Sequence, residues 1–173
     1  ERVKVTNTRG RAIVFDGKGP GGHADGNTVR DCIITGPASL DGIQFLASSN
    51  NRVEGCTISG VSRHGIYMAQ SSSSASQPNK PSDDNVITGN LVQNVTNNGI
   101  AVNGSNRNII TGNTLLNNSV NGIHITTSAS QPCNDNIVEF NTASGNLQYG
   151  LNIANAACNR TVVRDNNFSG NTV

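Results

Sequence analysis

The strongest constraint on the fold of this chain is a phrase of sixteen residues that occurs twice, at 87–102 and at 110–125. Eight of the sixteen positions are identical, and the two copies start 23 residues apart. A fixed period in the low twenties, with short β-type runs and no helical periodicity, is typical of a solenoid. A solenoid needs only a thin stacked core, which suits a composition of 34% apolar and 3% aromatic residues.

A looser pattern extends the repeat over the whole chain. An apolar residue is followed three positions later by Cys or Asn, in segments that start at 29, 53, 87, 110, 138 and 163. The segment 3–8 is a plausible first member, with Thr6 in the Cys/Asn position. We therefore expect about seven coils in one domain over 1–173, as a piece of a longer β-helix protein.

A second strand is expected after each segment, close to a Gly. Its copies are 11–15, 41–45, 64–68, 98–102, 121–125 and 149–153. Alternation along a strand predicts two inward columns: Ile13, Ile43, Ile66, Ile100, Ile123 and Leu151, and Phe15, Phe45, Met68, Val102, Ile125 and Ile153. Each coil repeats the same direction, so equivalent strands are parallel. The prediction is an all-β fold, a parallel β-helix.

The Cys/Asn position predicts a ladder inside the solenoid. Asn90, Asn113, Asn141 and Asn166 fall in one column, where their amides can hydrogen-bond along the axis. Cys32 and Cys56 occupy the same position in the early coils, and Cys133 and Cys158 also lie one coil apart. Either cysteine pair could form a disulfide, and we favour Cys133–Cys158 because it lies in a turn region. Stackable cysteine pairs favour an oxidising compartment.

The candidate site lies on the outer face of the second strand. The residue before each Gly and the residue two after it should face solvent, which brings together Arg11, Asp41, Gln44, His64, Tyr67, His124 and Tyr149. Asp41 and His64 would be neighbours, so that the carboxylate could orient the imidazole, with Tyr67 beside them as an acid. A solenoid must place polar residues outside in any case, so a row formed by chance remains the alternative.

Other classes of function find no support. The formal net charge is +1 and only 13% of residues are charged, so neither nucleic acid nor an anionic membrane is an expected partner. No apolar run is long enough to span a bilayer. No metal site is expected, because no Cys-x-x-Cys motif and no Cys-adjacent His is present. Calcium is left open as a cofactor.

Once the coils are aligned, the whole chain resembles the right-handed β-helix repeats of the pectin-lyase-like superfamily. Residues 11–68 are most similar to the catalytic modules of mannuronan C5-epimerases and related alginate lyases, through segments 14–16, 28–31, 40–45 and 62–68. In that family a Tyr, an Asp and two His abstract and return the sugar C5 proton. The resemblance matches Asp16 to the Asp and His64 to a His of an Arg-His-Gly segment. Ile13 replaces the family's Tyr, and His23 is displaced into a loop.

Two hypotheses of function follow. The first is a secreted polysaccharide-active β-helix, a lyase, epimerase or depolymerase that binds a uronic-acid-rich glycan. His64 or Tyr67 would be base or acid, Asp41 and Asp16 would orient or neutralise, and Arg11 or Arg63 would bind the carboxylate. Gln44, His124 and Tyr149 would contact the glycan.

The alternative is a non-catalytic structural or adhesive repeat, such as a phage tail spike or a surface protein. A homotrimer or flanking domains would then cover the coil ends, because a bare end is an open sheet edge. Both hypotheses predict an extracellular location or the surface of a virion.

Overall fold

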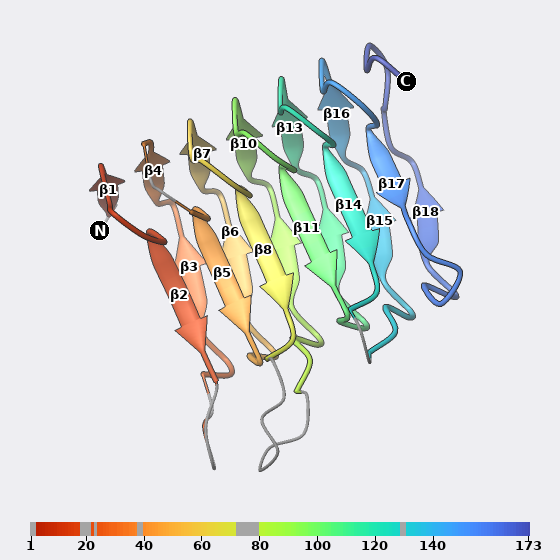
Figure 1. Ribbon diagram of the computed structural model, residues 1–173, viewed down its shortest axis with the longest axis horizontal. Coiled ribbons are helices and arrows are strands. Elements are labelled where there is room, and N and C mark those ends of the chain that lie inside the picture. The colour runs from red at the N-terminus through yellow and green to blue at the C-terminus, as the bar shows by residue number, and fades with distance from the viewer. Residues whose placement is uncertain (1–2, 18–21, 23, 38–39, 72–79, 129–130) are drawn as a thin grey trace.

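The computed structural model describes residues 3–17, 22, 24–37, 40–71, 80–128 and 131–173, and His23 lies outside them. In this part of the chain the backbone forms 18 short strands and no helix. The strands build three parallel sheets, each with six strands (Figure 1). The coils stack side by side from β1 at one end to β17 and β18 at the other. The expected all-β parallel β-helix is therefore confirmed. Nor do the described residues hold a helix that could span a membrane.

Each sheet takes one strand from each coil. Sheet A consists of β1 (Lys4–Thr6), β4 (Ile33–Thr35), β7 (Thr57–Ser59), β10 (Leu91–Gln93), β13 (Thr114–Leu116) and β16 (Thr142–Ser144). Sheet B consists of β2 (Ile13–Asp16), β5 (Ile43–Leu46), β8 (Ile66–Ala69), β11 (Ile100–Asn103), β14 (Ile123–Thr126) and β17 (Leu151–Ile153). Sheet C consists of β3 (Thr28–Arg30), β6 (Arg52–Glu54), β9 (Val86–Thr88), β12 (Ile109–Thr111), β15 (Ile137–Glu139) and β18 (Val162–Arg164).

The repeated segments form two strands each, where the sequence pattern predicted one. A residue with left-handed backbone separates the strand of sheet C from the strand of sheet A, and Gly89 and Gly112 have φ values of 63° and 64° there. Gly adopts this conformation without steric cost, so the chain turns a corner just before the Cys/Asn position. Each coil thus has three strands rather than two.

The number of coils also needs correction. β1 pairs with β4, which places Thr6 opposite Thr35 and not in the Cys/Asn column. The segment 3–8 therefore corresponds to the second half of a repeated segment. Within the described residues the solenoid has about six coils rather than about seven.

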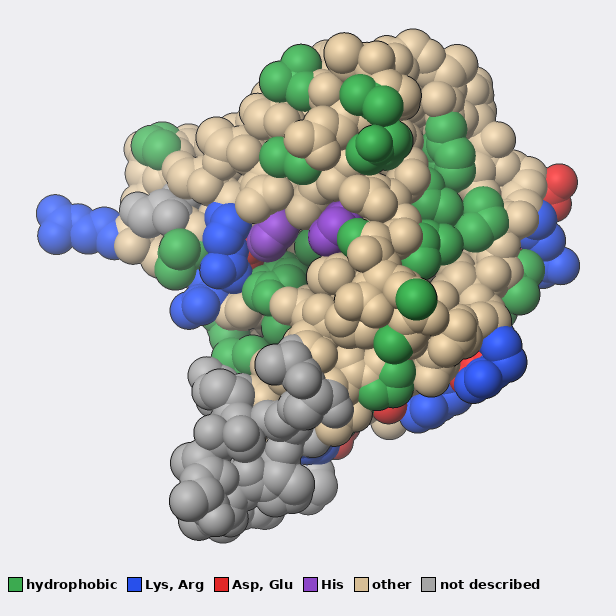
Figure 2. Space-filling view, turned by 45° about the vertical axis from the view of Figure 1, so that its right-hand side comes forward, with side chains coloured by type: hydrophobic (Ala, Val, Ile, Leu, Met, Phe, Trp, Pro, Cys, Tyr) green, Lys and Arg blue, Asp and Glu red, His purple; other side chains and the backbone are tan. Residues whose placement is uncertain are grey.

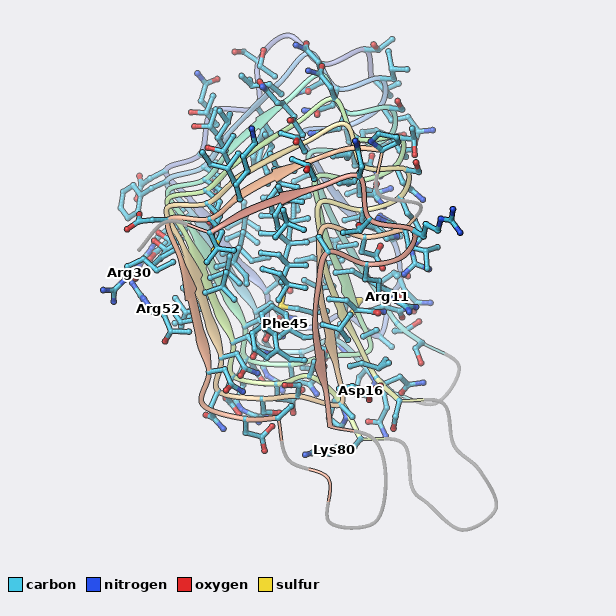
Figure 3. All side chains as sticks on the ribbon, turned by 90° about the vertical axis from the view of Figure 1, so that its left-hand side faces the viewer. Arg11, Asp16, Arg30, Phe45, Arg52 and Lys80 are labelled. Carbon is cyan, nitrogen blue, oxygen red and sulfur yellow. A yellow bond between two sulfur atoms is a disulfide. The ribbon has the colours of Figure 1, made fainter. Side chains whose placement is uncertain are left out.

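Both predicted inward columns are present in sheet B. The first column is fully buried and pairs in register through Ile43, Ile66, Ile100 and Ile123. The same is true of the second column, two residues further along each strand. The Phe15 ring stacks on the Phe45 ring with centroids 5.1 Å apart, and Figure 3 shows Phe45 inside the coil. The Gly before each strand is required by the close approach of the next coil. A Cβ on Gly99 would lie 2.7 Å from the carbonyl oxygen of Gly122.

Amide ladders connect the coils from within. Asn90 Nδ2 donates to Asn113 Oδ1 at 2.9 Å, and Asn113 Nδ2 donates to Asn141 Oδ1 at 3.0 Å, as predicted. Two further ladders were missed, one through Asn27, Asn51, Asn85, Asn108 and Asn136 and one through Asn118, Asn146 and Asn171. In each ladder the side chains also bond to backbone groups, which satisfies the polar atoms of the turns.

The cysteines behave as two different pairs. Cys133 and Cys158 form the favoured disulfide, with their Cα atoms 4.5 Å apart. Cys32 and Cys56 are free and buried. They stand at the head of the amide ladder, where the Cys56 backbone N–H donates to Asn90 Oδ1 at 2.9 Å.

Removing one ladder amide should weaken the whole solenoid. Asn113→Ala leaves the backbone N–H of Asn90 and the carbonyl oxygen of Ile87 without their partner, both in the buried interior. We expect the free energy of unfolding in guanidinium to fall by about 2–4 kcal/mol. Asn152→Ala, on the outer face of β17 and outside the ladders, is the matched control and should change it by less than about 0.5 kcal/mol. Equal losses for the two variants would contradict a special role of the ladder.

Candidate functional site

Three columns of side chains meet where the chain enters sheet B, and Asp41, Asn98 and Asn121 in the second of them are buried, where the sequence predicted exposure to solvent. The first column stands two residues before the Gly of each coil, the second stands directly before that Gly, and the third stands two residues after it. The first consists of Arg63, Asn97, Val120 and Gln148, whose backbones are joined coil to coil by hydrogen bonds of 2.8–3.2 Å. The second consists of Asp41, His64, Asn98, Asn121 and Tyr149. The third consists of Val14, Gln44, Tyr67, Ala101, His124 and Asn152.

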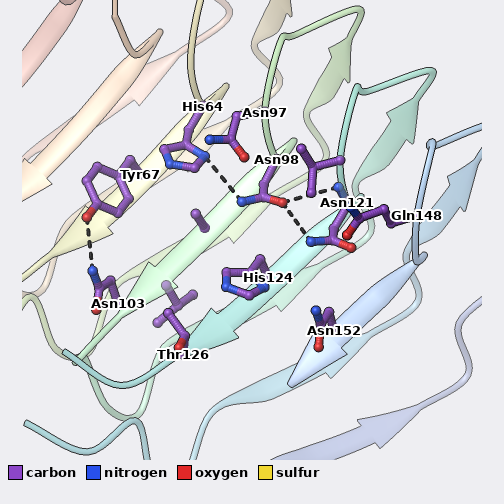
Figure 4. Close-up of a pocket in the computed structure, with 13 residues that line it drawn as sticks. His64, Tyr67, Asn97, Asn98, Asn103, Asn121, His124, Thr126, Gln148 and Asn152 are labelled. Carbon is purple, nitrogen blue, oxygen red and sulfur yellow. Dashed lines mark hydrogen bonds between the residues drawn. The ribbon is translucent and has the colours of Figure 1, made fainter. Parts of the chain in front are cut away.

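A hollow of about 380 Å³ opens over these columns in the last four coils (Figure 4). Ala101 lies between Tyr67 and His124 in the third column, so a methyl group stands where its neighbours carry rings. Asn98, Asn103, Asn121 and other amides form the rest of the lining. The volume falls within the range of small-ligand sites.

Asp41 is fully buried beside the hollow and holds two arginines. Its carboxylate accepts two hydrogen bonds from the Arg63 guanidinium, one of them from Nε at 2.7 Å, and lies 3.7 Å from Arg11 Nε. These hydrogen bonds raise the pKa of Arg63, which stays charged. Asp41 also accepts from the backbone N–H of His64 at 3.2 Å. Asp41 and His64 are therefore neighbours in adjacent coils, as predicted, but the hydrogen bond that joins them comes from the His64 backbone and not from its imidazole.

His64 replaces an amide in the second column. In the later coils Asn98 and Asn121 bond to each other at 2.8 Å, and the His64 Nδ1 lies 3.5 Å from Asn98 Nδ2. Burial lowers the pKa of His64 to about 4, because the charged imidazole would lose its hydration. The neighbouring Asp41 opposes this shift, and Arg63 and His124 add to it. At neutral pH the imidazole is uncharged and can accept a proton.

Tyr67 packs against a cation and an imidazole. Its ring centroid lies 4.8 Å from that of His64, and the Arg63 Cζ lies 4.8 Å from the Tyr67 ring. Its hydroxyl accepts a hydrogen bond of 3.1 Å from Asn103 Nδ2. The phenolic proton therefore remains available for a ligand in the hollow.

His124 faces the hollow from the other side of Ala101. Burial lowers its pKa as well, so two uncharged imidazoles flank the same space at neutral pH. Its Nδ1 is enclosed and has no hydrogen-bond partner among the described residues. Of the nine residues predicted for the site, His64, Tyr67 and His124 line the hollow, and Arg63 and Asp41 adjoin it.

The other predicted residues lie apart from the hollow. Arg11 is exposed and reaches Asp41, and Gln44 is buried between Val14 and Tyr67 in the third column. Asp16 lies at the far end of β2, in the column that continues through Leu46 and Ala69 to Asn103. Tyr149 is 39% exposed in the last coil. The structure thus brings five of the nine together and leaves four at the margin.

Asn97, Val120 and Gln148 line the hollow and were missed from the sequence. They share a signal, because each stands two residues before the Gly of its coil, in the position of Arg63. Apart from Arg63 and Asp16, the prediction used only the residue directly before the Gly and the residue two positions after it.

The charge of the site is unevenly distributed. Arg63 stands at the hollow's edge and shares the Asp41 carboxylate with the more distant Arg11, and no residue that lines the hollow is Lys, Arg, Asp or Glu. Figure 2 shows basic side chains directly beside the two histidines on one side, with uncharged surface around the rest. Among the described residues no group of three or more His, Cys, Asp and Glu could hold a metal ion.

A protein-family model covers the coils of this chain. The family model described as "Right handed beta helix region" matches residues 1–132 and 82–173. The chain belongs to this family. Membership of this family confirms the right-handed coil that the resemblance predicted. No curated protein matches the chain.

Solved structures with this fold include enzymes and a viral protein. A double mutant of the periplasmic alginate epimerase AlgG is 15% identical, with a TM-score of 0.78 over 95% of this chain and 38% of that one. The A-module of the Azotobacter vinelandii mannuronan C-5 epimerase AlgE4 is 15% identical, with a TM-score of 0.57 over 96% and 52%. A tailspike protein double mutant of E. coli bacteriophage HK620 is 16% identical, with a TM-score of 0.67 over 94% and 32%. At these identities the likeness shows the fold alone, and the chain spans about a third to a half of each neighbour.

The lowered pKa of His64 predicts a loss of stability in mild acid. Between pH 6.5 and about 4 His64 binds a proton in the unfolded chain but not in the folded chain. The free energy of unfolding therefore falls as the pH falls. The loss attributable to His64 is about 2–3 kcal/mol. His64→Asn restores the amide found in the next two coils, and we expect its stability to decline less over this range. Parallel declines for the two proteins, measured by guanidinium unfolding at each pH, would contradict the burial of a neutral His64.

Proposed function

We propose that this chain is the polysaccharide-active part of an extracellular protein and binds an acidic glycan along the outer face of sheet B. The observation that carries the proposal is the hollow over Ala101, which has His64, Tyr67 and His124 around it and Arg63 at its edge. Neutral imidazoles, a phenol and a cation are the groups that proton transfer beside a carboxylate requires.

The arginines supply the attraction for an acidic sugar. Asp41 neutralises only one of the two positive charges of Arg11 and Arg63, which leaves a net charge of about +1 at this edge. Arg63 donates to Asp41 through Nε and Nη2, and its Nη1 hydrogens remain for a second carboxylate. A uronate carboxylate placed there would lie beside Tyr67 and His64.

The chemistry that fits is removal of the C5 proton of a uronate. His64 or His124 takes the proton, and Arg63 balances the negative charge that develops on the carboxylate. Return of a proton to the opposite face gives the C5 epimer. If Tyr67 instead donates its proton to the C4 oxygen as the C4–O bond breaks, the product is an unsaturated sugar. Hydrolysis by two carboxylates is not supported, because no Asp or Glu lines the hollow.

Two further observations favour this proposal. The similar structures include an alginate epimerase and a mannuronan C-5 epimerase, both of which act on acidic polysaccharides by their names. The Cys133–Cys158 disulfide favours an oxidising compartment, which suits a secreted protein or a virion. Roles for Asp16, Gln44 and Tyr149, calcium, and the assembly into a trimer or with flanking domains stay predictions.

Tyr67→Phe tests the acid in the proposed reaction. We expect the kcat for unsaturated-product formation from polymannuronate or polygalacturonate to fall about 100-fold or more, because the phenolic proton is lost. Tyr149→Phe removes the chain's other phenol outside the hollow and should leave kcat within about twofold. If wild-type protein forms no unsaturated product, deuterium exchange at C5 in D₂O, followed by NMR, identifies the epimerase reaction.

The outcomes separate the hypotheses. A wild-type chain that binds these glycans without releasing product or exchanging C5 protons would be the adhesive, non-catalytic repeat. A wild-type chain that binds no acidic glycan would contradict the proposed function.

Ala101→Leu tests the position of the site. The side chain points outward, and the same column holds Val14 and Gln44 in earlier coils, so the strand accepts larger residues. We expect an unchanged thermal midpoint and a loss of glycan binding of about tenfold or more, because leucine fills the hollow. Val14→Leu, in the same column three coils away, is the control and should bind as the wild type does. Unchanged binding by Ala101→Leu would place the site elsewhere.

A further inference from the structure

The three outer columns divide sharply into a charged part and an uncharged part. Arg11, Asp41 and Arg63 belong to the coils of β2, β5 and β8. In the coils of β11, β14 and β17 the same three columns hold only uncharged residue types and His124: Asn97, Asn98, Ala101, Val120, Asn121, His124, Gln148, Tyr149 and Asn152. The hollow therefore has a cation at one end and none along the rest of its length.

This division bears on the kind of acidic glycan that the groove can hold. In a homopolymer of uronates every sugar carries a carboxylate, so several would lie over the uncharged coils. A carboxylate that leaves water without a cation or a donor in compensation costs free energy. Burial keeps the imidazoles of His64 and His124 uncharged at neutral pH, so they do not supply the missing charge.

The uncharged coils are suited to hydroxyl groups instead. The amides of Asn97, Gln148 and Asn152 can both donate and accept hydrogen bonds. A sugar hydroxyl can use both the donor and the acceptor of such an amide, whereas a carboxylate can use only the donor and keeps its uncompensated charge.

We propose that the groove is specific for a mixed glycan, in which one uronate binds at Arg63 and the following sugars, over β11, β14 and β17, are neutral. This inference rests on the proposed function and adds the class of substrate. One coil step is roughly 4.8 Å, close to the length of one sugar in a glycan, so about three neutral sugars lie between Tyr67 and Asn152. The site then recognises a uronate that is followed by neutral sugars, and not the total negative charge of the glycan.

Three tetrasaccharides test the proposal by calorimetric titration of the wild-type chain. The gellan backbone unit has one glucuronate and three neutral sugars, tetragalacturonate has four uronates, and cellotetraose has none. We expect the gellan unit to bind at least about tenfold more tightly than either of the others, which corresponds to one uncompensated carboxylate or one lost ion pair. Tetragalacturonate binding as tightly as the gellan unit would overturn this inference and leave the proposed function standing. Failure of both acidic sugars to bind would overturn the proposed function itself.

A charge added to the neutral end gives a second, independent test. Asn152→Arg places a cation beside His124 on the outer face of β17. We expect it to raise the affinity for tetragalacturonate about tenfold and to give the gellan unit no gain, because the neutral sugar there loses the Asn152 amide and has no charge to offer the arginine. Thr114→Arg adds the same charge on sheet A and should raise neither affinity. An equal gain for both acidic sugars in Asn152→Arg would show a general effect of charge and overturn the inference.

Discussion

The hydrogen bonds of the buried Asn113 amide show what holds this solenoid in register. Its oxygen accepts from the backbone and the side chain of Asn90, and its nitrogen donates to Asn141 and to two carbonyl oxygens. A shift of one residue in any coil would leave these polar atoms unpaired inside the protein, at a cost of about 1–3 kcal/mol each. Three such ladders therefore fix the register of the coils that they join. The outer columns, and the hollow between Tyr67 and His124, follow from that register.

The period of the repeat and the alternation after each Gly were enough to predict the parallel solenoid, both inward columns of sheet B and the first ladder. The corner inside each repeated segment was missed, because it depends on left-handed backbone at residues as different as Gly89, Asp31 and Phe140. At the site, the pattern predicted that His64, Tyr67 and His124 share one face. It could not show that Asp41 would hold Arg63 and a backbone N–H, since that depends on side-chain direction within the column. Nor could it show the hollow, which arises because one small residue, Ala101, lies between two rings.

Among the described residues, two carboxylates each hold a pair of arginines, and only one of these two clusters adjoins the hollow. On sheet C, Arg30 and Arg52 share Glu54, much as Arg11 and Arg63 share Asp41 on the sheet B side. Asp41 is fully buried, so its carboxylate holds Arg63 in a defined position. Glu54 is partly exposed, so its pairs with Arg30 and Arg52 are surface ion pairs that add little to stability. Figure 3 shows Arg30 and Arg52 outside the coil on a face of their own. An acidic polymer could be drawn to either place by charge alone, and only sheet B offers it neutral bases and a phenol.

Chemical-shift mapping tests the central claim, that an acidic glycan binds over sheet B. Backbone amide shifts of the labelled chain are recorded with and without an acidic oligosaccharide. The account predicts that the perturbed amides cluster at residues 63–67, 97–103 and 120–126, with those around Arg30, Arg52 and Glu54 unchanged. Perturbation centred on sheet C, with the residues around Ala101 unaffected, would contradict it.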